Sequence, residues 1–221
     1  MKSLLLKSLF KAEASIAYSI LSKYEYAHEA IINIDKIINE VILSLRSDFR
    51  EVSEGVFVHV SAKISKNAEL CAPCIIDKDA QIRQGAYIRG NAIVGKNCVL
   101  GNSCELKSAI LFDEAAIPHF NYVGNSIVGY KAHLGAGVII SNLKSDKSNV
   151  KIDTGSKKID THARKFGALV GDYAEIGCGT VLNPGTVVMP HATIYPLSSV
   201  RGTVPENCIY KDGGYIVAKR N

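Results

Sequence analysis

Histidine and cysteine are the residue types of this chain whose chemistry is easiest to recognise from spacing, and there are six of each. A zinc hydratase needs three histidines around the metal and an open fourth position. No close pairing of that kind is present among His28, His59, His119, His133, His162 and His191. Cys71 and Cys74 form one C-x-x-C motif without a second pair at zinc-site spacing. We therefore expect no metal site, and cysteines that act as small buried residues.

The charge of the chain excludes one class of partner. The net charge is +5, but no long Lys/Arg run or basic-aromatic stripe accompanies it, so we expect no nucleic-acid partner. An anionic small molecule suits scattered basic residues better. Lys7 and Lys11 interrupt the apolar start of the chain, no small-residue cleavage site follows, and no stretch approaches the roughly 20 apolar residues of a membrane span. These features predict a soluble, cytoplasmic protein with no membrane partner.

A six-residue period dominates the chain from Val58 onward. Nine aliphatic residues follow one another at intervals of six: Val58, Ile64, Leu70, Ile76, Ile82, Ile88, Val94, Leu100 and Leu106. The position four residues after each is small in eight of the nine cases, usually Ala or Cys. The period resumes at Val128 and again from Val170 to Val200. It fits neither a helix at 3.6 residues nor a strand at 2.0, so each hexapeptide is a structural repeat.

The physical account of this repeat is a triangular solenoid. Each hexapeptide is a short strand and a corner, three make one coil, and the branched aliphatic residue points into the prism. Successive coils stack as parallel strands about 4.8 Å apart, so each inward side chain lies on its counterpart one coil away. The pattern predicts a mainly β parallel β-helix of about six coils over residues 51–221.

Three regions depart from the period. Residues 1–50 have apolar residues at three- and four-residue spacing and predict two amphipathic helices that break between Lys23 and His28. The interval from Leu106 to Val128 is 22 residues, which predicts extra residues between Phe112 and Tyr122. Residues 142–166 are polar and predict a loop that leaves the coil. After Val200 we expect a turn and a final strand.

One stretch carries a set of motifs beyond the hexapeptides. It contains E-L-K at 105–107, P-H-x-N-Y-V-G at 118–124, L-G-A-G at 134–137 and S-N at 141–142. I-R precedes it at 88–89, and K-F-G-A-L-V-G-D and N-P-G follow at 165–172 and 183–185. In these motifs the chain resembles the C-terminal acetyltransferase domain of bifunctional sugar-1-phosphate nucleotidylyltransferases, from about Val58 to Val200. That resemblance implies a left-handed β-helix and N-acetylation of glucosamine-1-phosphate or a related amino sugar, with acetyl-CoA as co-substrate and no metal.

The resemblance also implies roles for individual residues on the substrate side. His119 matches the general base that takes a proton from the sugar amine. Arg89 and Lys107 match the cations that hold the sugar phosphate, and Tyr122 and Asn142 match groups that bind and orient the sugar. Glu105 lies two residues from Lys107, so on a strand it faces the same side and is expected to position it.

On the cofactor side, the backbone near Ala136 is expected to face the acyl group and CoA, and Cys178 and Pro196 fall where the family lines its CoA channel. The family places its sites between three parallel prisms, which implies a homotrimer. His133 stands where the family often has Asn, which adds a second titratable group near the site.

Alternatives remain for these residues and for the whole chain. His119 is also consistent with a corner histidine bonded to backbone, and Arg89 and Lys107 with ordinary solvated side chains. The chain would then be a non-catalytic sugar-nucleotide-binding or assembly subunit on the same fold. Residues 1–57 contain one glycine and no Gly-rich phosphate loop, so no nucleotidylyltransferase activity is expected of this chain.

Overall fold

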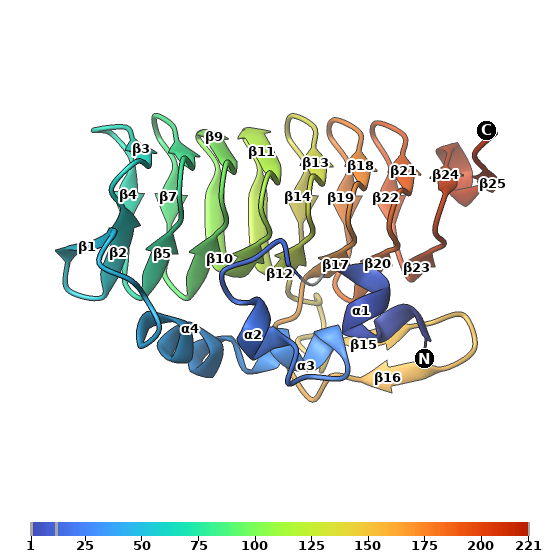
Figure 1. The fold of residues 1–221 in the computed structure, drawn as a ribbon. Coiled ribbons are helices and arrows are strands. Elements are labelled where there is room, and N and C mark those ends of the chain that lie inside the picture. The colour runs from blue at the N-terminus through green and yellow to red at the C-terminus, as the bar shows by residue number, and fades with distance from the viewer. Residues whose placement is uncertain (1, 12, 221) are drawn as a thin grey trace.

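The computed structural model describes residues 2–11 and 13–220, and most of them form a left-handed parallel β-helix with three flat faces (Figure 1). The predicted fold class is confirmed. Strands of the first face are β2 (Val56–His59), β5 (Cys74–Ile76), β8 (Ala92–Val94), β17 (Ala168–Val170), β20 (Thr186–Val188) and β23 (Thr203–Val204).

The second and third faces follow in chain order within each coil. Strands of the second face are β3 (Lys63–Ile64), β6 (Gln81–Ile82), β9 (Val99–Asn102), β11 (Ala116–His119), β13 (His133–Leu134), β18 (Glu175–Ile176), β21 (Thr193–Ile194) and β24 (Cys208–Tyr210). Strands of the third face are β4 (Glu69–Leu70), β7 (Tyr87–Ile88), β14 (Ile139–Ile140), β19 (Val181–Leu182) and β22 (Ser199–Val200). Two longer strands, β10 (Glu105–Leu111) and β12 (Tyr122–Val128), continue from the third face into the first.

The core consists of the inward aliphatic residues that the six-residue period identified. Partners on neighbouring coils are in register, as for Ile76 with Val94 and Val170 with Val188, and these side chains are fully buried. From Cys74 onward the small position is buried too, and burial raises the pKa of the Cys74 thiol to about 12 and also raises that of Cys98. The second face has eight parallel strands, so the helix is longer than the six coils predicted. The six-residue period does not predict two of the coils, because their inward residues lie outside its register.

The prediction of extra residues between Phe112 and Tyr122 is wrong. The inward residues of β10 are Leu106 and Leu111, five apart, and the same shortening recurs in β12. The missing residue is at the corner from the third face to the first, which Ser108 (φ 48°) and Asn125 (φ 48°) turn in the left-handed region. Two coils are thus each one residue shorter than the others, and β10 and β12 run on through their corners.

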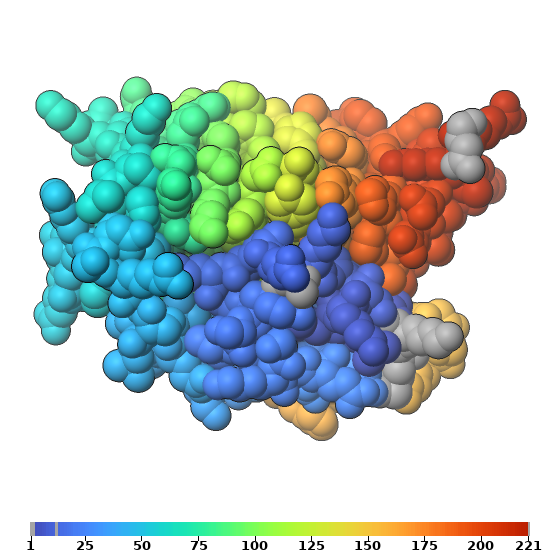
Figure 2. Space-filling model, viewed as in Figure 1, coloured from blue at the N-terminus to red at the C-terminus, as the bar shows by residue number. Residues whose placement is uncertain are grey.

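The N-terminal part of the chain covers the first face. Instead of two helices it forms a 3-10 turn, η1 (Lys2–Leu4), and four short helices: α1 (Leu6–Leu9), α2 (Tyr18–Leu21), α3 (Ala27–Ile32) and α4 (Ile34–Ile42). These pack on the outward residues of the first face, all fully buried: Ile75, Ile93, Ile110, Ile127, Leu169 and Val187. Figure 2 shows this segment spread along one side of the prism. The first face is therefore closed to any partner, while the second and third faces stay open. None of the described helices is long and apolar enough to cross a membrane.

Short antiparallel elements complete the chain. β1 (Phe49–Ser53) pairs with β2 at one end, and β25 (Ile216–Ala218) pairs with β24 at the other, after the turn η2 (Asp212–Gly214). The expected turn and final strand are thus present. The stretch at 142–166 leaves the coil between β14 and β17 and contains an unpredicted hairpin, β15 (Lys151–Asp153) with β16 (Lys158–Asp160).

Candidate functional site

The third face brings the expected phosphate-binding residues together. Glu105 lies between Tyr87 and Tyr122 on neighbouring strands, and Lys107 lies beside Gly124. The Arg89 guanidinium donates a hydrogen bond from Nη1 to Oε1 of Glu105 at 2.7 Å. Glu105 therefore pairs with Arg89 on the neighbouring coil, and no direct bond to Lys107 is formed within the described chain. Both side chains of this pair are more than a third exposed, so the bond serves mainly to orient the guanidinium.

A third cation joins this group from outside the coil. Lys165 ends the excursion at 142–166 and forms an isolated antiparallel bridge with Leu143. Burial lowers the pKa of Lys107, and the nearby charges of Lys165 and Arg89 lower it further, whereas Glu105 opposes the shift. Two ammonium groups and a guanidinium thus converge on one patch. An anion with more than one negative charge is the natural complement of such a patch.

Lys165 is the site residue that sequence reasoning did not assign. Lys165 is the first residue of the K-F-G-A-L-V-G-D motif, but the motif alone predicts no role for this lysine. Its position depends on how the chain returns from a long excursion, which the hexapeptide period does not determine.

Tyr122 and Asn142 converge above Gly124. A Cβ atom at Gly124 would lie 2.6 Å from both the Tyr122 hydroxyl oxygen and Nδ2 of Asn142. Nδ2 of Asn142 also donates a hydrogen bond to Oδ1 of Asn125 at 2.7 Å. Burial and the charge of Glu105 raise the pKa of Tyr122, so its hydroxyl stays protonated and serves as a donor or acceptor. Any residue larger than glycine at 124 would fill the space where these two groups meet.

His119 lies at the end of β11, where the second face turns into the third. Its side chain is exposed, and its ring nitrogens form no hydrogen bond within residues 2–11 and 13–220. The corner itself is held by Asn121, which is 3% exposed. Oδ1 of Asn121 accepts the His119 N–H at 3.0 Å, and Nδ2 donates to the Gly135 carbonyl at 2.7 Å. Asn121 therefore fixes the backbone of the histidine and leaves the imidazole accessible.

The residues expected to contact CoA form one line with His119. His119, Ala136, Cys178 and Pro196 each stand two residues after an inward aliphatic of the second face. Backbone bonds join their coils: Gly137 N–H donates to the His119 carbonyl at 3.0 Å and Gly179 N–H to the Ala136 carbonyl at 2.8 Å. At one coil step of about 4.8 Å, this line runs about 14 Å from His119 to Pro196. The side chains of Ala136, Cys178 and Pro196 are all exposed.

The second histidine near the motif has a different environment. His133 lies in β13 on the flat second face, and its Nδ1 is 3.1 Å from Oε2 of Glu175 on the next strand. It therefore lies on a different face from the third-face patch. No cluster of three or more His, Cys, Asp or Glu side chains suited to a metal ion occurs in the described part of the chain.

The patch and the corner line form an open surface on a single chain. Two large apolar side chains stand exposed on this corner, Phe120 at 60% and Leu197 at 84%. Each directly follows a residue of the corner line.

Comparison with known proteins gives the family of the chain. The family described as the GMPPB C-terminal domain matches residues 70–204, which is more than half of the chain. The "Bifunctional protein GlmU" of Methanococcus vannielii is 32% identical over 118 residues, which are 53% of this chain and 28% of that protein. The "Bifunctional sugar-1-phosphate nucleotidylyltransferase/acetyltransferase" of Sulfurisphaera tokodaii is 30% identical over 92 residues, or 42% of this chain and 23% of that protein. The chain thus spans about a quarter of the length of these curated relatives.

Among solved structures, the N-acyltransferase AntD from Bacillus cereus, in complex with dTDP-4-amino-4,6-dideoxyglucose and coenzyme A, superposes with a TM-score of 0.42. It is 12% identical, and the match covers 76% of this chain and 82% of AntD. The match to residues 70–204 begins at the end of the first coil, spans the third-face patch and ends with β23, before β24 and β25. The chain belongs to the family of GMPPB C-terminal domains.

Proposed function

We propose that the chain transfers an acetyl group from acetyl-CoA to the amine of an amino sugar phosphate or related sugar nucleotide, with His119 as the general base. The observation that carries the proposal is that two surfaces border the same face of the prism. A triple-cation patch lies on the third face, and the exposed line that begins at His119 runs along its edge. The name of the Sulfurisphaera relative, which includes an acetyltransferase, supports the same reaction class.

The patch supplies the binding energy for the sugar phosphate. Burial lowers the pKa of Lys107 and the charge of nearby Lys165 lowers it further, so the two ammonium groups repel one another without an anion. A phosphate dianion between them and Arg89 removes that repulsion and forms charge-assisted hydrogen bonds. Glu105 holds Arg89 in place for this role. Tyr122 and Asn142, which meet above Gly124, then offer a hydroxyl and an amide to the sugar hydroxyls.

The chemical step needs one proton acceptor. An amine nitrogen attacks the thioester carbonyl carbon, and His119 takes the proton that the amine loses. The new C–N bond forms and the C–S bond breaks. The imidazolium then returns its proton to the departing thiolate, so the products are the N-acetyl sugar and the CoA thiol. Imidazole can accept and return a proton near neutral pH, so histidine is the side chain suited to both transfers.

The open surface supports a homotrimer as the active form. The first face is covered by the N-terminal helices, so neighbouring copies must meet through the second and third faces. A threefold arrangement of such contacts closes on itself and leaves no surface unpaired. Phe120 and Leu197 would be buried there, and the second face of one copy would form the other wall of the cleft beside His119.

A thiol-release assay tests the proposal. Acetyl-CoA is incubated with the protein and, in turn, glucosamine 1-phosphate, other amino sugar phosphates, amino sugar nucleotides and the matching hydroxy sugars. We expect thiol release with at least one amino compound, none with its hydroxy counterpart, and no change when EDTA is added. Binding of the sugar nucleotide without thiol release from any acyl-CoA would favour the non-catalytic subunit instead.

A further inference from the structure

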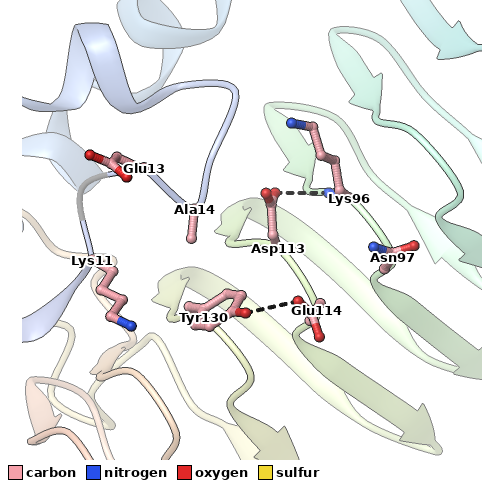
Figure 3. Close-up of a pocket in the computed structure, with 8 residues that line it drawn as sticks. All are labelled: Lys11, Glu13, Ala14, Lys96, Asn97, Asp113, Glu114 and Tyr130. Atoms are coloured by element: carbon pink, nitrogen blue, oxygen red, sulfur yellow. Dashed lines mark hydrogen bonds between the residues drawn. The ribbon is translucent and has the colours of Figure 1, made fainter.

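Two polar cavities lie at another corner of the prism, where the first face turns into the second. The N-terminal segment runs along this corner: the Leu9 carbonyl accepts a hydrogen bond from Asp172 N–H at 3.0 Å, and the Ala14 carbonyl accepts one from Asp113 N–H at 2.9 Å. Two cavities remain between segment and coils, of about 610 Å³ and about 420 Å³, and Lys96 lines both. Figure 3 shows the larger one, where the Lys96 amine points away from the Glu114–Tyr130 hydrogen bond. The third-face patch contributes no residue to either cavity.

Buried aspartates follow this corner, and one of them is incompletely bonded. Asp172 uses both carboxylate oxygens, for the backbone N–H groups of Tyr130 and Lys11. Asp77, which is 2% exposed, uses only Oδ1, which accepts the Lys78 N–H at 2.7 Å. Its Oδ2 is buried and has no hydrogen-bond partner among the described residues. An unpartnered buried oxygen of this kind costs stability unless a donor reaches it.

Asp77 lines part of the smaller cavity. The other walls carry groups that would bind the rest of a ligand with such a donor. Its walls include the cations Arg46, Lys78 and Lys96, none of which forms an ion pair within the described residues. Phe49 lines another part, together with the apolar side chains of Ile16 and Leu45.

His59 also lines the cavity but is already engaged. Its Nδ1 accepts the Ser61 N–H at 3.1 Å and its Nε2 lies 3.2 Å from Oδ2 of Asp48. Neither ring nitrogen is therefore available to Asp77.

We propose that this cavity binds a nucleotide, with its base against Phe49, a base N–H donated to Oδ2 of Asp77, and its phosphate on Arg46, Lys78 and Lys96. A buried acceptor selects a ligand with an N–H or O–H donor, an apolar wall selects a flat or apolar group, and three unpaired cations select a phosphate. A nucleotide carries all three features within the size of such a cavity. The inference is independent of the proposed acetyl transfer, because the two sites lie on different corners.

Calorimetric titration of the full chain with UMP, GMP and AMP tests the site, with uridine, guanosine, adenosine, inorganic phosphate and glucose 1-phosphate as partial ligands. We expect at least one nucleotide to bind with a submillimolar dissociation constant, and its nucleoside and both simple phosphates to bind at least about tenfold more weakly. Asp77→Asn keeps the Oδ1 acceptor for Lys78 N–H but places an NH₂ donor at the free position. It should weaken nucleotide binding about tenfold or more without lowering the melting temperature.

Two further variants separate this cavity from the third-face patch. Lys96→Ala should weaken the nucleotide about tenfold, whereas Lys63→Ala, an exposed lysine of β3, should leave it unchanged. Lys107→Ala should also leave it unchanged. The proposal is overturned if no nucleotide binds at millimolar concentration, if Asp77→Asn binds as the wild type does, or if Lys107→Ala removes the binding.

Discussion

Replacement of His119 by alanine separates a catalytic base from a structural corner histidine. The imidazole is exposed and makes no hydrogen bond within the described chain, so its loss should change the free energy of unfolding by less than about 0.5 kcal/mol. The corner is held instead by the His119 backbone and Asn121, which the substitution keeps. Loss of a general base lowers kcat about 10²–10⁴-fold, or about 2.7–5.4 kcal/mol of barrier.

The assay measures initial rates of thiol release at saturating acetyl-CoA, with the melting temperature recorded for the same preparation. Asn121→Ala is the matched structural control. It removes the bond to the partly buried His119 N–H and one of the two bonds to the Gly135 carbonyl, which still accepts the Val138 N–H, and this should cost about 1–3 kcal/mol of stability. His133→Asn breaks only the exposed contact to Glu175 and should remain active. If His119→Ala keeps more than about a tenth of the wild-type turnover, or loses stability as Asn121→Ala does, the base assignment is wrong.

Four further predictions follow, two on the patch, one on the assembly and one on the covered face. Lys165→Ala should raise KM for the sugar phosphate about tenfold with little change in kcat. Burial and Lys165 lower the pKa of Lys107, so this side chain should lose its charge at a pH below the ordinary lysine pKa near 10.4, and the wild-type KM for the sugar phosphate should rise there. Lys107→Arg should remove that rise, as a pH profile of kcat/KM would show. Leu197→Asp should convert a trimer to monomers in sedimentation velocity, and a wild-type chain that sediments as a monomer at micromolar concentration would contradict the shared cleft. Ile110→Ala should lower the free energy of unfolding by about 2–5 kcal/mol in urea titration, because that side chain is fully buried beneath the N-terminal helices; a change below about 1 kcal/mol would mean that the helices do not dock there.

The β-helix was predictable because one physical requirement repeats in every hexapeptide. The inward residue must be a branched aliphatic, so residues such as Val94 and Leu100 set the period without reference to distant contacts. The shortened corners at Ser108 and Asn125 were misread, because an interval of 22 residues fits extra residues as well as missing ones. The strand register shows which occurred, because Leu106 pairs with Ile88 and Leu111 with Val94, so five residues lie opposite six.

The packing of the N-terminal helices on the first face is indicated by residues that are not part of the six-residue period. Ile75, Ile93 and Leu169 each lie directly before an inward residue, so on a strand they point outward, and a run of outward aliphatics needs a partner. Neither the second face nor the third face carries a comparable row of outward aliphatic residues. The division of residues 1–50 into four short helices was less predictable, because it follows from packing on that row and not from helix periodicity.

The candidate site was predictable where it depends on repeat position, and not elsewhere. His119 and Cys178 share a corner because equal offsets from inward residues occupy equal places in every coil. Lys165 was missed because it returns from the excursion at 142–166, whose path no spacing rule determines. Glu105 was expected to position Lys107, yet its bond is to Arg89 on the preceding coil, a choice that depends on side-chain length and not on strand alternation.

Mass spectrometry of the products tests the central claim most directly. Isotope-labelled acetyl-CoA is incubated with an amino sugar 1-phosphate and the wild-type chain, with the Lys107→Ala, Lys165→Ala double variant as the comparison. We predict an amide product that carries the labelled acetyl group from the wild type, and a product yield reduced by at least about tenfold at subsaturating sugar phosphate for the double variant. Labelled acetate from thioester hydrolysis without any acetylated sugar, or equal product from both proteins, would contradict acetyl transfer at this site.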